Sequence, residues 1–501
     1  MKPVPRSILF SAIERYVSLV LFFVGTAVLA RLLTPAEFGV YAVINALTSI
    51  IAASAQELGG ANYLIQKQDL SRANIHTTFT ITVAISAFIS VLLLAAAQPL
   101  SRFFGQEGLA FGVVVSALSF LLLPVSNTIS ALFRRNMEFR ELAVCNLVAN
   151  ASGIVVSCVL AACHFSYMAP VWGAVTNTAA LAIMLLSRYA SFDIFRISLV
   201  DSREIISFGL YSSAISIINM FYNLSPQLFL ARVLDFASVG LYSRAVNLTQ
   251  VFDKLITQVV NPVLMPAVVA QRKVGADLKA VYLETMQLLA AVQWPFLLFI
   301  AVMAQPIIFL WLGSGWLEIV PIVRLLCIAN TALFAACLSY PMFVATGNVR
   351  SALVTSLISL PPSLLVILLA SFFGVQMVAA SALVTLPFQA AVAIYYLARL
   401  LNIKVSQLVH SLTKSVVVTI LTSVGPVVCA TLVDNGTMTA LLGLISASVS
   451  AALCWVLGLM LAAHPLLRRL GEAAESLAFV VPGVTAERWA AWFHYVQKDR
   501  W

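Results

Sequence analysis

Residues Ala30–Leu47 read ARLLTPAEFGVYAVINAL, and residues Ala231–Leu248 read ARVLDFASVGLYSRAVNL. Aligned without a gap at an offset of 201 residues, the two stretches share seven of eighteen residues. The identical pairs are Ala30/Ala231, Arg31/Arg232, Leu33/Leu234, Ala36/Ala237, Gly39/Gly240, Tyr41/Tyr242 and Leu47/Leu248. Each stretch leaves one long apolar run and enters the next, and a Gln-Pro pair recurs at Gln98 and Gln305. The sequence therefore predicts two repeated halves of like orientation.

The composition around these repeats is that of a membrane protein. Of the 501 residues, 61% are hydrophobic and 10% are charged, and the mean hydropathy is +0.99. A soluble domain has about 25% charged residues, so most of this surface must face lipid. The 29 basic residues against 20 acidic ones are typical of positive membrane loops and need no nucleic acid. The seven cysteines are scattered and form no metal or disulfide pattern, and we expect no cofactor.

Fourteen apolar runs are long enough to cross a bilayer, which takes about 20 residues. The first is predicted to be a retained helix and not a signal peptide. The predicted spans are 9–33, 39–63, 75–98, 109–133, 142–163, 168–188, 206–230, 239–265, 278–304, 319–345, 351–373, 377–399, 412–433 and 438–462. We thus predict an all-α polytopic membrane protein with two parallel six-helix lobes and two extra C-terminal helices. The predicted domains are 1–195, 196–402, 403–464 and 465–501.

The distribution of charge along the chain predicts the orientation in the membrane. If the N-terminus lies in the cytoplasm, 22 of the 29 basic residues fall on the cytoplasmic side, three fall outside and four lie within spans. This asymmetry is the one that the positive-inside rule describes, so both termini are predicted to be cytoplasmic. In the tail, Trp489, Trp492, Phe493 and Val496 share one helical face. They predict an amphipathic helix on the membrane surface or against a partner protein.

Three of the predicted spans carry polar stripes that lipid cannot solvate. The first span has Ser11, Arg15, Ser18 and Thr26; the seventh has Ser212, Ser216, Asn219, Asn223 and Gln227; the eighth has Arg244, Asn247, Gln250, Lys254, Gln258 and Asn261. Such groups face a hydrated cavity or hydrogen-bond neighbouring helices. Because arginine and lysine stand among them, we favour a cationic cavity that suits a pyrophosphate group. Arg15 has a second explanation, since it lies close enough to a helix end to snorkel.

Acidic residues within the spans offer a means of coupling transport to an ion. Glu14, Asp253, Glu284 and, by its position, Glu57 lie in or at predicted spans. Each could bind a proton or sodium ion, or form a structural ion pair, and the sequence leaves both interpretations open.

The first repeated stretch, Ala30–Tyr41, resembles a motif of the multidrug/oligosaccharidyl-lipid/polysaccharide exporter superfamily, and within it the Wzx-type polysaccharide flippases. Two weaker matches are Ala131–Arg140 and Gly240–Ala245. The resemblance covers roughly residues 5–400 and implies two six-helix bundles with alternating access. It also implies a lipid-linked oligosaccharide on undecaprenyl diphosphate as the substrate, moved from the inner to the outer leaflet. The expected substrate-binding residues are Arg15, Arg31, Arg232, Arg244 and Lys254.

Other functions remain open at this stage. One is a multidrug or cation antiporter, or a peptidoglycan-precursor flippase, of the same superfamily, although an antiporter for cationic drugs should have a net acidic or aromatic cavity. Another is a membrane-embedded glycan polymerase or ligase, which would need a larger outside loop than this chain has. No GxxxxGK[ST] loop for ATP is present. We therefore expect a transporter and not an enzyme, a monomer in the bacterial inner membrane, with membrane lipid and other polysaccharide-assembly proteins as partners.

Overall fold

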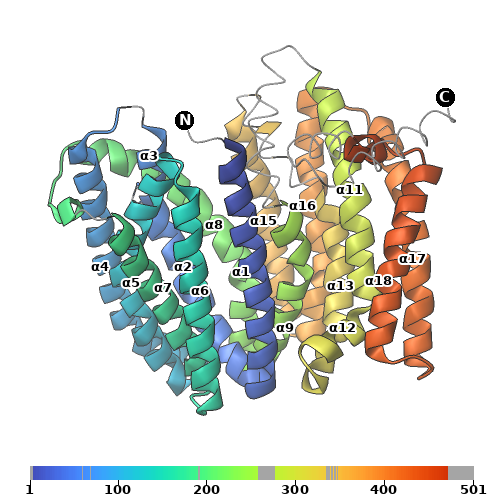
Figure 1. The fold of residues 1–501 in the computed structure, drawn as a ribbon, viewed down its shortest axis with the longest axis horizontal. Coiled ribbons are helices and arrows are strands. Elements are labelled where there is room, and N and C mark those ends of the chain that lie inside the picture. Colours follow the sequence, from blue (N-terminus) through green and yellow to red (C-terminus); the bar gives the residue numbers. More distant parts are fainter. Residues whose placement is uncertain are drawn as a thin grey trace. The chain divides into compact units, whose positions relative to one another are not determined.

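The computed structural model describes residues 4–58, 60–67, 69–189, 192–257, 277–334 and 348–471, together with residues 339, 342, 343 and 346. Within these ranges the chain forms helices and connections, and no strand is present (Figure 1). The predicted surface helix around Trp489, and the polar residues Gln258 and Asn261, lie outside the described residues. The all-α prediction is confirmed.

The chain divides into two compact units. The first comprises residues 1–247, 311–319 and 362–381, and the second comprises 248–310, 320–361 and 382–501. The predicted lobe boundary at residue 195 falls between helices of the first unit and rests on the sequence repeat alone, so it stays a prediction.

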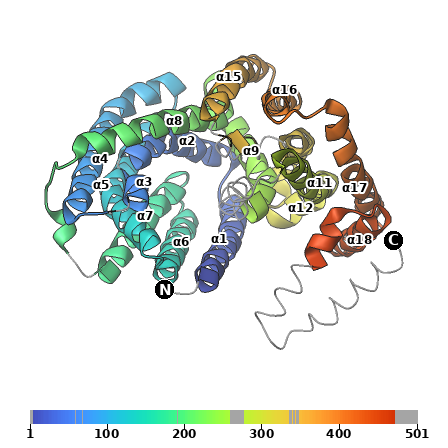
Figure 2. The same cartoon turned by 90° about the horizontal axis from the view of Figure 1, so that it is seen from above.

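The first unit is built mainly from the N-terminal helices. They are α1 (Val4–Leu32), α2 (Pro35–Leu58), α3 (Ala61–Gln66), α4 (Arg72–Phe104), α5 (Glu107–Arg135), α6 (Phe139–Ala162), α7 (Met168–Tyr189), the 3-10 turn η1 (Phe192–Phe195), α8 (Ser202–Val233) and α9 (Phe236–Thr249). The pairs α6 and α7, α4 and α5, α2 and α8, and α1 and α6 pack side by side (Figure 2). The 3-10 turn η3 (Ser314–Ile319) also belongs to this unit.

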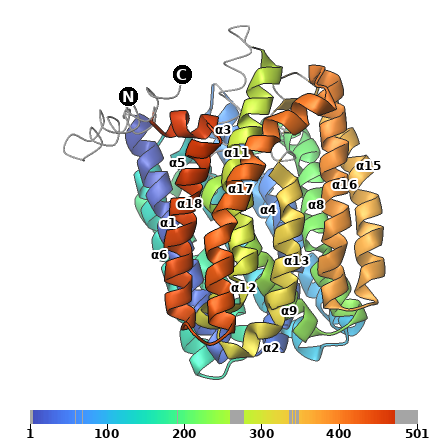
Figure 3. The same cartoon turned by 90° about the vertical axis from the view of Figure 1, so that its right-hand side faces the viewer.

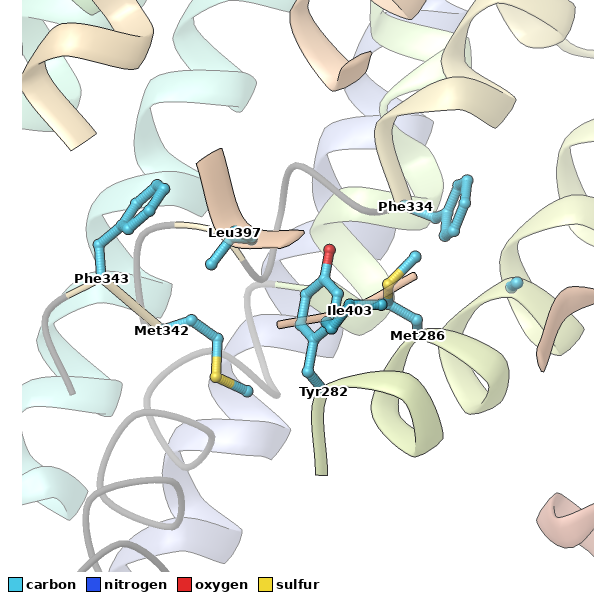
Figure 4. Close-up of a cluster of buried hydrophobic side chains, with 8 residues drawn as sticks. Tyr282, Met286, Phe334, Met342, Phe343, Leu397 and Ile403 are labelled. Carbon is cyan, nitrogen blue, oxygen red and sulfur yellow. The ribbon is translucent and has the colours of Figure 1, made fainter. Parts of the chain in front are cut away.

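The second unit contains most of the C-terminal helices. They are the π-helical turn η2 (Asp253–Thr257), α11 (Leu278–Val302), α12 (Ala304–Trp311), α13 (Val320–Asn330), the 3-10 turn η4 (Thr331–Phe334), α15 (Val349–Ser371), α16 (Val375–Leu401), α17 (Val405–Asp434) and α18 (Ala440–Leu461). Residues 362–371 of α15 and 375–381 of α16 belong to the first unit. Residues of α11, α16 and the connection before α15 form a buried cluster around Tyr282 and Met286 (Figure 4).

Twelve described segments are long and apolar enough to cross a membrane, which confirms a multi-pass membrane protein. Every predicted span overlaps a described helix, but α8 and α9 are not among the twelve. The described part of α8 carries Asn219, Asn223 and Gln227, which lower its hydropathy, and α9 is described over only 14 residues. The count of fourteen spans therefore stays a prediction.

The two sequence repeats begin their helices with the same kind of cap. At the start of α2, the Thr34 and Glu37 side chains each accept a hydrogen bond from the other residue's backbone N–H, at 3.4 and 2.7 Å. At the start of α9, the Asp235 carboxylate accepts from the Ser238 N–H at 2.7 Å. Thr34 and Asp235 are equivalent at the offset of 201 residues. Both caps satisfy N–H groups that a helix cannot pair internally.

The repeated helices α2 and α9 cross at their glycines. A methyl group placed on Gly39 would lie 1.6 Å from the carbonyl oxygen of Phe236, and one placed on Gly240 would lie 1.9 Å from the carbonyl oxygen of Pro35. Gly39 and Gly240 are repeat equivalents, and so are Pro35 and Phe236. The contact is therefore reciprocal about a local two-fold relation, and the missing side chains let the two backbones touch.

In the second unit, the added pair α17 and α18 docks onto α11 (Figure 3). The Trp455 Nε1–H donates to the Ala291 carbonyl at 2.8 Å. His464, just beyond α18, is 2% exposed. Its Nδ1 accepts from the Leu466 N–H at 3.1 Å, and Nε2 lies 3.2 Å from the Ser415 hydroxyl. Burial, and then the Lys414 charge, lower the pKa of His464 to about 4, so this docking needs a neutral imidazole.

Gly39→Ala and Gly240→Ala should each destabilise the protein, because a methyl group must push one backbone away from the other. Overpacking of this kind costs about 1–3 kcal/mol. The apparent melting temperature of purified protein in detergent measures the loss. Gly315→Ala is the matched control, because a methyl group there meets no heavy atom within 4 Å. Equal melting temperatures for the Gly39 and Gly315 variants would contradict the crossing.

The stability of the protein should fall as the pH drops from about 6.5 towards 4. In this pH window His464 is protonated in the unfolded protein and neutral in the folded one, so protonation favours unfolding. The folded pKa of about 4 corresponds to a decrease of up to about 3 kcal/mol in the free energy of unfolding. Melting temperatures measured across that range should depend less on pH in His464→Gln. The exposed His410 provides the control, and a His410→Gln variant that removed the same dependence would refute this assignment.

Candidate functional site

Arg244 on α9 is a buried cation beside an aromatic cluster. Arg244 is 7% exposed, and its guanidinium carbon lies 4.5 Å from the centre of the Phe38 ring. The Phe38 ring meets the Trp316 ring edge-on at 5.4 Å, and the Trp316 Nε1–H donates to the Ala30 carbonyl at 2.8 Å. Phe38, which packs against Trp316, thus covers one face of the guanidinium through a cation–π contact.

No carboxylate neutralises this charge within the part of the chain that the structure describes. Arg244 forms no ion pair there, and its Nε–H is buried without a hydrogen-bond partner. An uncompensated buried charge destabilises a fold by several kcal/mol, and the Phe38 ring offsets only about 2 kcal/mol of that. The Nε–H of Arg244 can therefore donate a hydrogen bond to an anion.

The repeat crossing determines where Arg244 lies. The residue equivalent to Arg244 in the first copy is Val43, which is fully buried. The two copies therefore share a backbone arrangement, but only the second copy places a cation at this position. Because Gly39 and Gly240 bring α2 and α9 into contact, the Arg244 side chain reaches Phe38, one residue before Gly39.

A polar cavity of about 330 Å³ lies between α1, α5 and α6. Its lining residues are Ser11, Glu14, Arg15, Ser18, Arg134, Phe139, Leu142, Asn146 and Asn150. Two arginines against one glutamate leave this cavity with a positive charge. The structure therefore places Arg15, Ser11 and Ser18 from the predicted first stripe around one open space.

Hydrogen bonds from asparagine side chains connect the helices at the wall of this cavity. The Asn146 Nδ2–H donates to the Glu14 carboxylate at 3.1 Å. The Asn150 Nδ2–H donates to the Ser18 hydroxyl at 3.0 Å, and Asn177 of α7 donates to the Asn150 oxygen at 2.8 Å. Interhelical bonding and a polar cavity, the two interpretations left open by the sequence, coexist here.

Arg31, Arg232 and Lys254 are not among the residues that line the α1 cavity. Arg31 and Arg232 are both exposed near the ends of α1 and α8, with the Arg232 guanidinium 5.1 Å from the Phe103 ring centre. Arg31 is sixteen residues from Arg15 on α1, which is about 24 Å along a helix. Lys254 is half-buried in η2 and belongs to the second unit. Its proximity to Arg244 stays a prediction.

The predicted polar lining of α8 and α9 is only partly buried. Asn219, Asn223 and Gln250 are exposed, whereas Ser216, Gln227 and Asn247 are half-buried. Gln258 lies outside the described residues. Since lipid cannot solvate exposed amides at membrane depth, these positions still favour a wet surface, and their role as a cavity lining stays a prediction.

Three of the four predicted acidic residues have different surroundings, and the side chain of the fourth, Glu57, lies outside the described part of the chain. Glu14 lines the α1 cavity. The Glu284 carboxylate accepts from Arg469 Nη2 at 2.6 Å and Nε at 3.0 Å, which favours the structural ion pair that the sequence left open. Asp253 is half-buried in η2 of the second unit. Among the described residues, no group of three or more His, Cys, Asp or Glu is placed to hold a metal.

The sequence pattern alone does not identify the α5 and α6 side of the cavity. Arg134, Asn146 and Asn150 line it, and Asn177 of α7 bonds Asn150. Asn146 and Asn150 stand four residues apart in an apolar helix, and residues at that spacing share a helix face. That spacing is the feature of the sequence that predicts a polar face on this helix.

Comparison with known proteins places the chain among polysaccharide-assembly proteins. The model of a family described as polysaccharide biosynthesis protein matches residues 28–321. The lipopolysaccharide biosynthesis protein WzxC of Escherichia coli (strain K12) is 24% identical over 327 residues, 64% of this chain and 65% of WzxC. The succinoglycan biosynthesis transport protein ExoT of Rhizobium meliloti (strain 1021) is 24% identical over 356 residues, 69% and 70% of the two chains. The match thus spans about two thirds of each relative.

Solved structures share the fold. The lipid II flippase MurJ, in an inward closed conformation, superposes with a TM-score of 0.73 over 90% of this chain and 98% of MurJ, at 11% identity. An inward-facing multidrug resistance MATE family transporter of the MOP superfamily gives a TM-score of 0.63 over 78% and 98%, at 12% identity. At these identities the likeness concerns the fold alone.

Cysteines placed at Ser11 and Ser18 should react with a hydrophilic methanethiosulfonate reagent, because both positions line the polar cavity. Mass spectrometry of the labelled protein measures the reaction. The native Cys145, fully buried next to Asn146 on α6, should stay unmodified. The unsubstituted protein reports the background from the exposed Cys163. If the cysteine at 18 were as unreactive as Cys145, the cavity would not be hydrated.

Proposed function

The chain belongs to the polysaccharide biosynthesis protein family, and we propose that it flips undecaprenyl-diphosphate-linked oligosaccharide repeat units across the bacterial cytoplasmic membrane. The direction is from the inner to the outer leaflet, and the product serves exopolysaccharide or lipopolysaccharide biosynthesis. The resemblance to Wzx-type flippases is confirmed by the family match, by WzxC and ExoT, and by the transporter fold.

The observation that carries the proposal is the buried, unneutralised guanidinium of Arg244. A diphosphate carries negative charge and many acceptor oxygens, and arginine binds such groups through short charge-assisted hydrogen bonds. In a water-poor site each of these bonds is stronger than in water. The charge of Arg244 would therefore be satisfied by the substrate rather than by the protein, and release of the substrate would restore the costly unpaired state. This cycle suits a transporter, which must release its substrate as well as bind it.

A second basic position lies at another depth of the first unit. Arg15 and Arg134 line the α1 cavity, whereas Arg244 lies near Ala30 through Phe38 and Trp316. Fifteen residues of α1 separate Arg15 from Ala30, which is about 22 Å along the helix. Two cationic positions at different depths favour stepwise movement of an anionic head group, as alternating access requires.

The charge of Arg244 disfavours a cation antiporter, and the short connections disfavour a glycan polymerase or ligase. A cation antiporter would be expected to hold its cargo with carboxylates, and Arg244 has no carboxylate partner among the described residues. A glycan polymerase or ligase would need a catalytic loop, whereas the described connections between successive helices are short. We infer a transporter in the inner membrane with both termini in the cytoplasm, acting as a monomer beside other polysaccharide-assembly proteins.

Arg244→Met should strongly reduce transport while preserving or raising stability. The variant keeps the volume near Phe38 but removes the charge, so a diphosphate loses bonds that contribute about 1.5–3 kcal/mol each. Export should fall at least about tenfold. Surface polysaccharide is measured in a producing strain that lacks its own copy of the gene, and the melting temperature is measured on purified protein.

Two controls make the Arg244 result specific. Arg244→Lys keeps the charge and should retain partial transport, because lysine lacks the bidentate geometry. Arg399→Ala removes an exposed arginine at the end of α16 and should leave surface polysaccharide unchanged. Normal export by Arg244→Met at equal protein levels would eliminate Arg244 as a head-group ligand.

A further inference from the structure

The connection between α7 and α8 exposes large apolar side chains outside any membrane-spanning helix. Ile197 is 85% exposed, Leu199 is 67% exposed and Val200 is 54% exposed. In a connection surrounded by water these side chains would be expected to turn inward, since burying one contributes about 1.5–3 kcal/mol.

The connection is fixed in place by contacts with α4. Ile194 is 1% exposed, and the Phe195 ring meets the Phe79 ring edge-on at 5.4 Å. The Thr77 hydroxyl donates to the Ser198 hydroxyl at 2.9 Å, and the Ser198 N–H donates to the Thr80 hydroxyl at 3.2 Å.

With Ile194 and Ser198 held against α4, the backbone directs Ile197, Leu199 and Val200 outward, and the connection runs along the outside of α4 (Figure 1). Their exposure is therefore built into the fold.

The exposed side chains continue a surface that already faces lipid. The contact residue Thr80 lies one turn before Val83, the first of the exposed apolar residues of the α4 span, which continue through Phe88 and Val91. Arg72 begins α4, eight residues before Thr80, so about 12 Å separates them along the helix. The apolar side chains thus lie one or two helix turns below the polar end of α4, at the depth where amphipathic segments enter a leaflet.

Basic groups border the apolar side chains. The side chains of Arg72 and Arg196 are 85% and 73% exposed and share the single carboxylate of Asp193, at 3.5 and 3.2 Å. Arg203 is exposed as well, while Asp201 is engaged by Asn74 at 2.8 Å and by Lys67 at 3.6 Å. Guanidinium groups above an apolar surface suit phospholipid phosphates above acyl chains.

We propose that residues 195–200 form an interfacial membrane anchor, with Ile197, Leu199 and Val200 immersed in the lipid leaflet and the neighbouring arginines at the phosphate level. The occupant of this surface is the lipid bilayer itself and not a protein partner. The anchor ties the connection between α7 and α8 to the membrane plane, so that this connection cannot lift away from the leaflet. The inference rests on the multi-pass fold and not on the identity of the cargo.

A fluorescent label on Ile197→Cys tests the anchor in phospholipid nanodiscs. The environment-sensitive label should be quenched by phospholipids with brominated chains and protected from aqueous iodide. Leu199→Cys supplies a second position if the first variant folds poorly. Asn435→Cys, in the exposed polar connection between α17 and α18, is the control and should show the opposite preference. The unsubstituted protein corrects for labelling of native cysteines.

The anchor predicts that iodide quenches the label at 197 several-fold less than the label at 435. Equal quenching by iodide at both positions would overturn the anchor and would show a surface open to water or to a soluble partner. Because the assay measures depth and not transport, its failure would leave the proposed function standing. A loss of export in Arg244→Met would likewise say nothing about this surface.

Discussion

The backbone contact between α2 and α9 at Gly39 and Gly240 is the constraint on which the rest of the first unit depends. Two helices that approach this closely fix each other's position and rotation, since any added side chain would occupy the space of a carbonyl group. The fixed rotation places Arg244 above Phe38. A modest change at the crossing would therefore alter the position of the buried cation as well as the packing.

The buried cation shows how function and stability oppose each other in this protein. A site that neutralised Arg244 with a carboxylate would be more stable but would compete with an anionic substrate. The structure instead provides an aromatic face, which attracts a cation but occupies none of its hydrogen-bond donors. The guanidinium therefore remains able to bind an anion. Because Phe38 already stabilises part of the buried charge, an anion gains less free energy by binding there.

Lipid as the solvent decides how the remaining polar groups are arranged. The Asn150 side chain bonds both Ser18 and Asn177, because an unpaired amide in hydrocarbon costs several kcal/mol. The same bonds line one wall of the α1 cavity, so interhelical packing and a polar path use the same side chains. Outside the helices, the same solvent explains an exposed apolar side chain, because lipid solvates Ile197 at a lower free-energy cost than water does.

The sequence alone determined the membrane class, the all-α fold and the family, because hydropathy, span length and short motifs are local properties. It also identified Arg15 and Arg244 as unusual charges. Only the tertiary structure decided that Arg31 and Arg232 are exposed, that Arg134 joins the Arg15 cavity, and that Phe38 faces Arg244. The reason is that a periodic pattern fixes which face of one helix is polar, whereas the crossing of two helices fixes which faces meet.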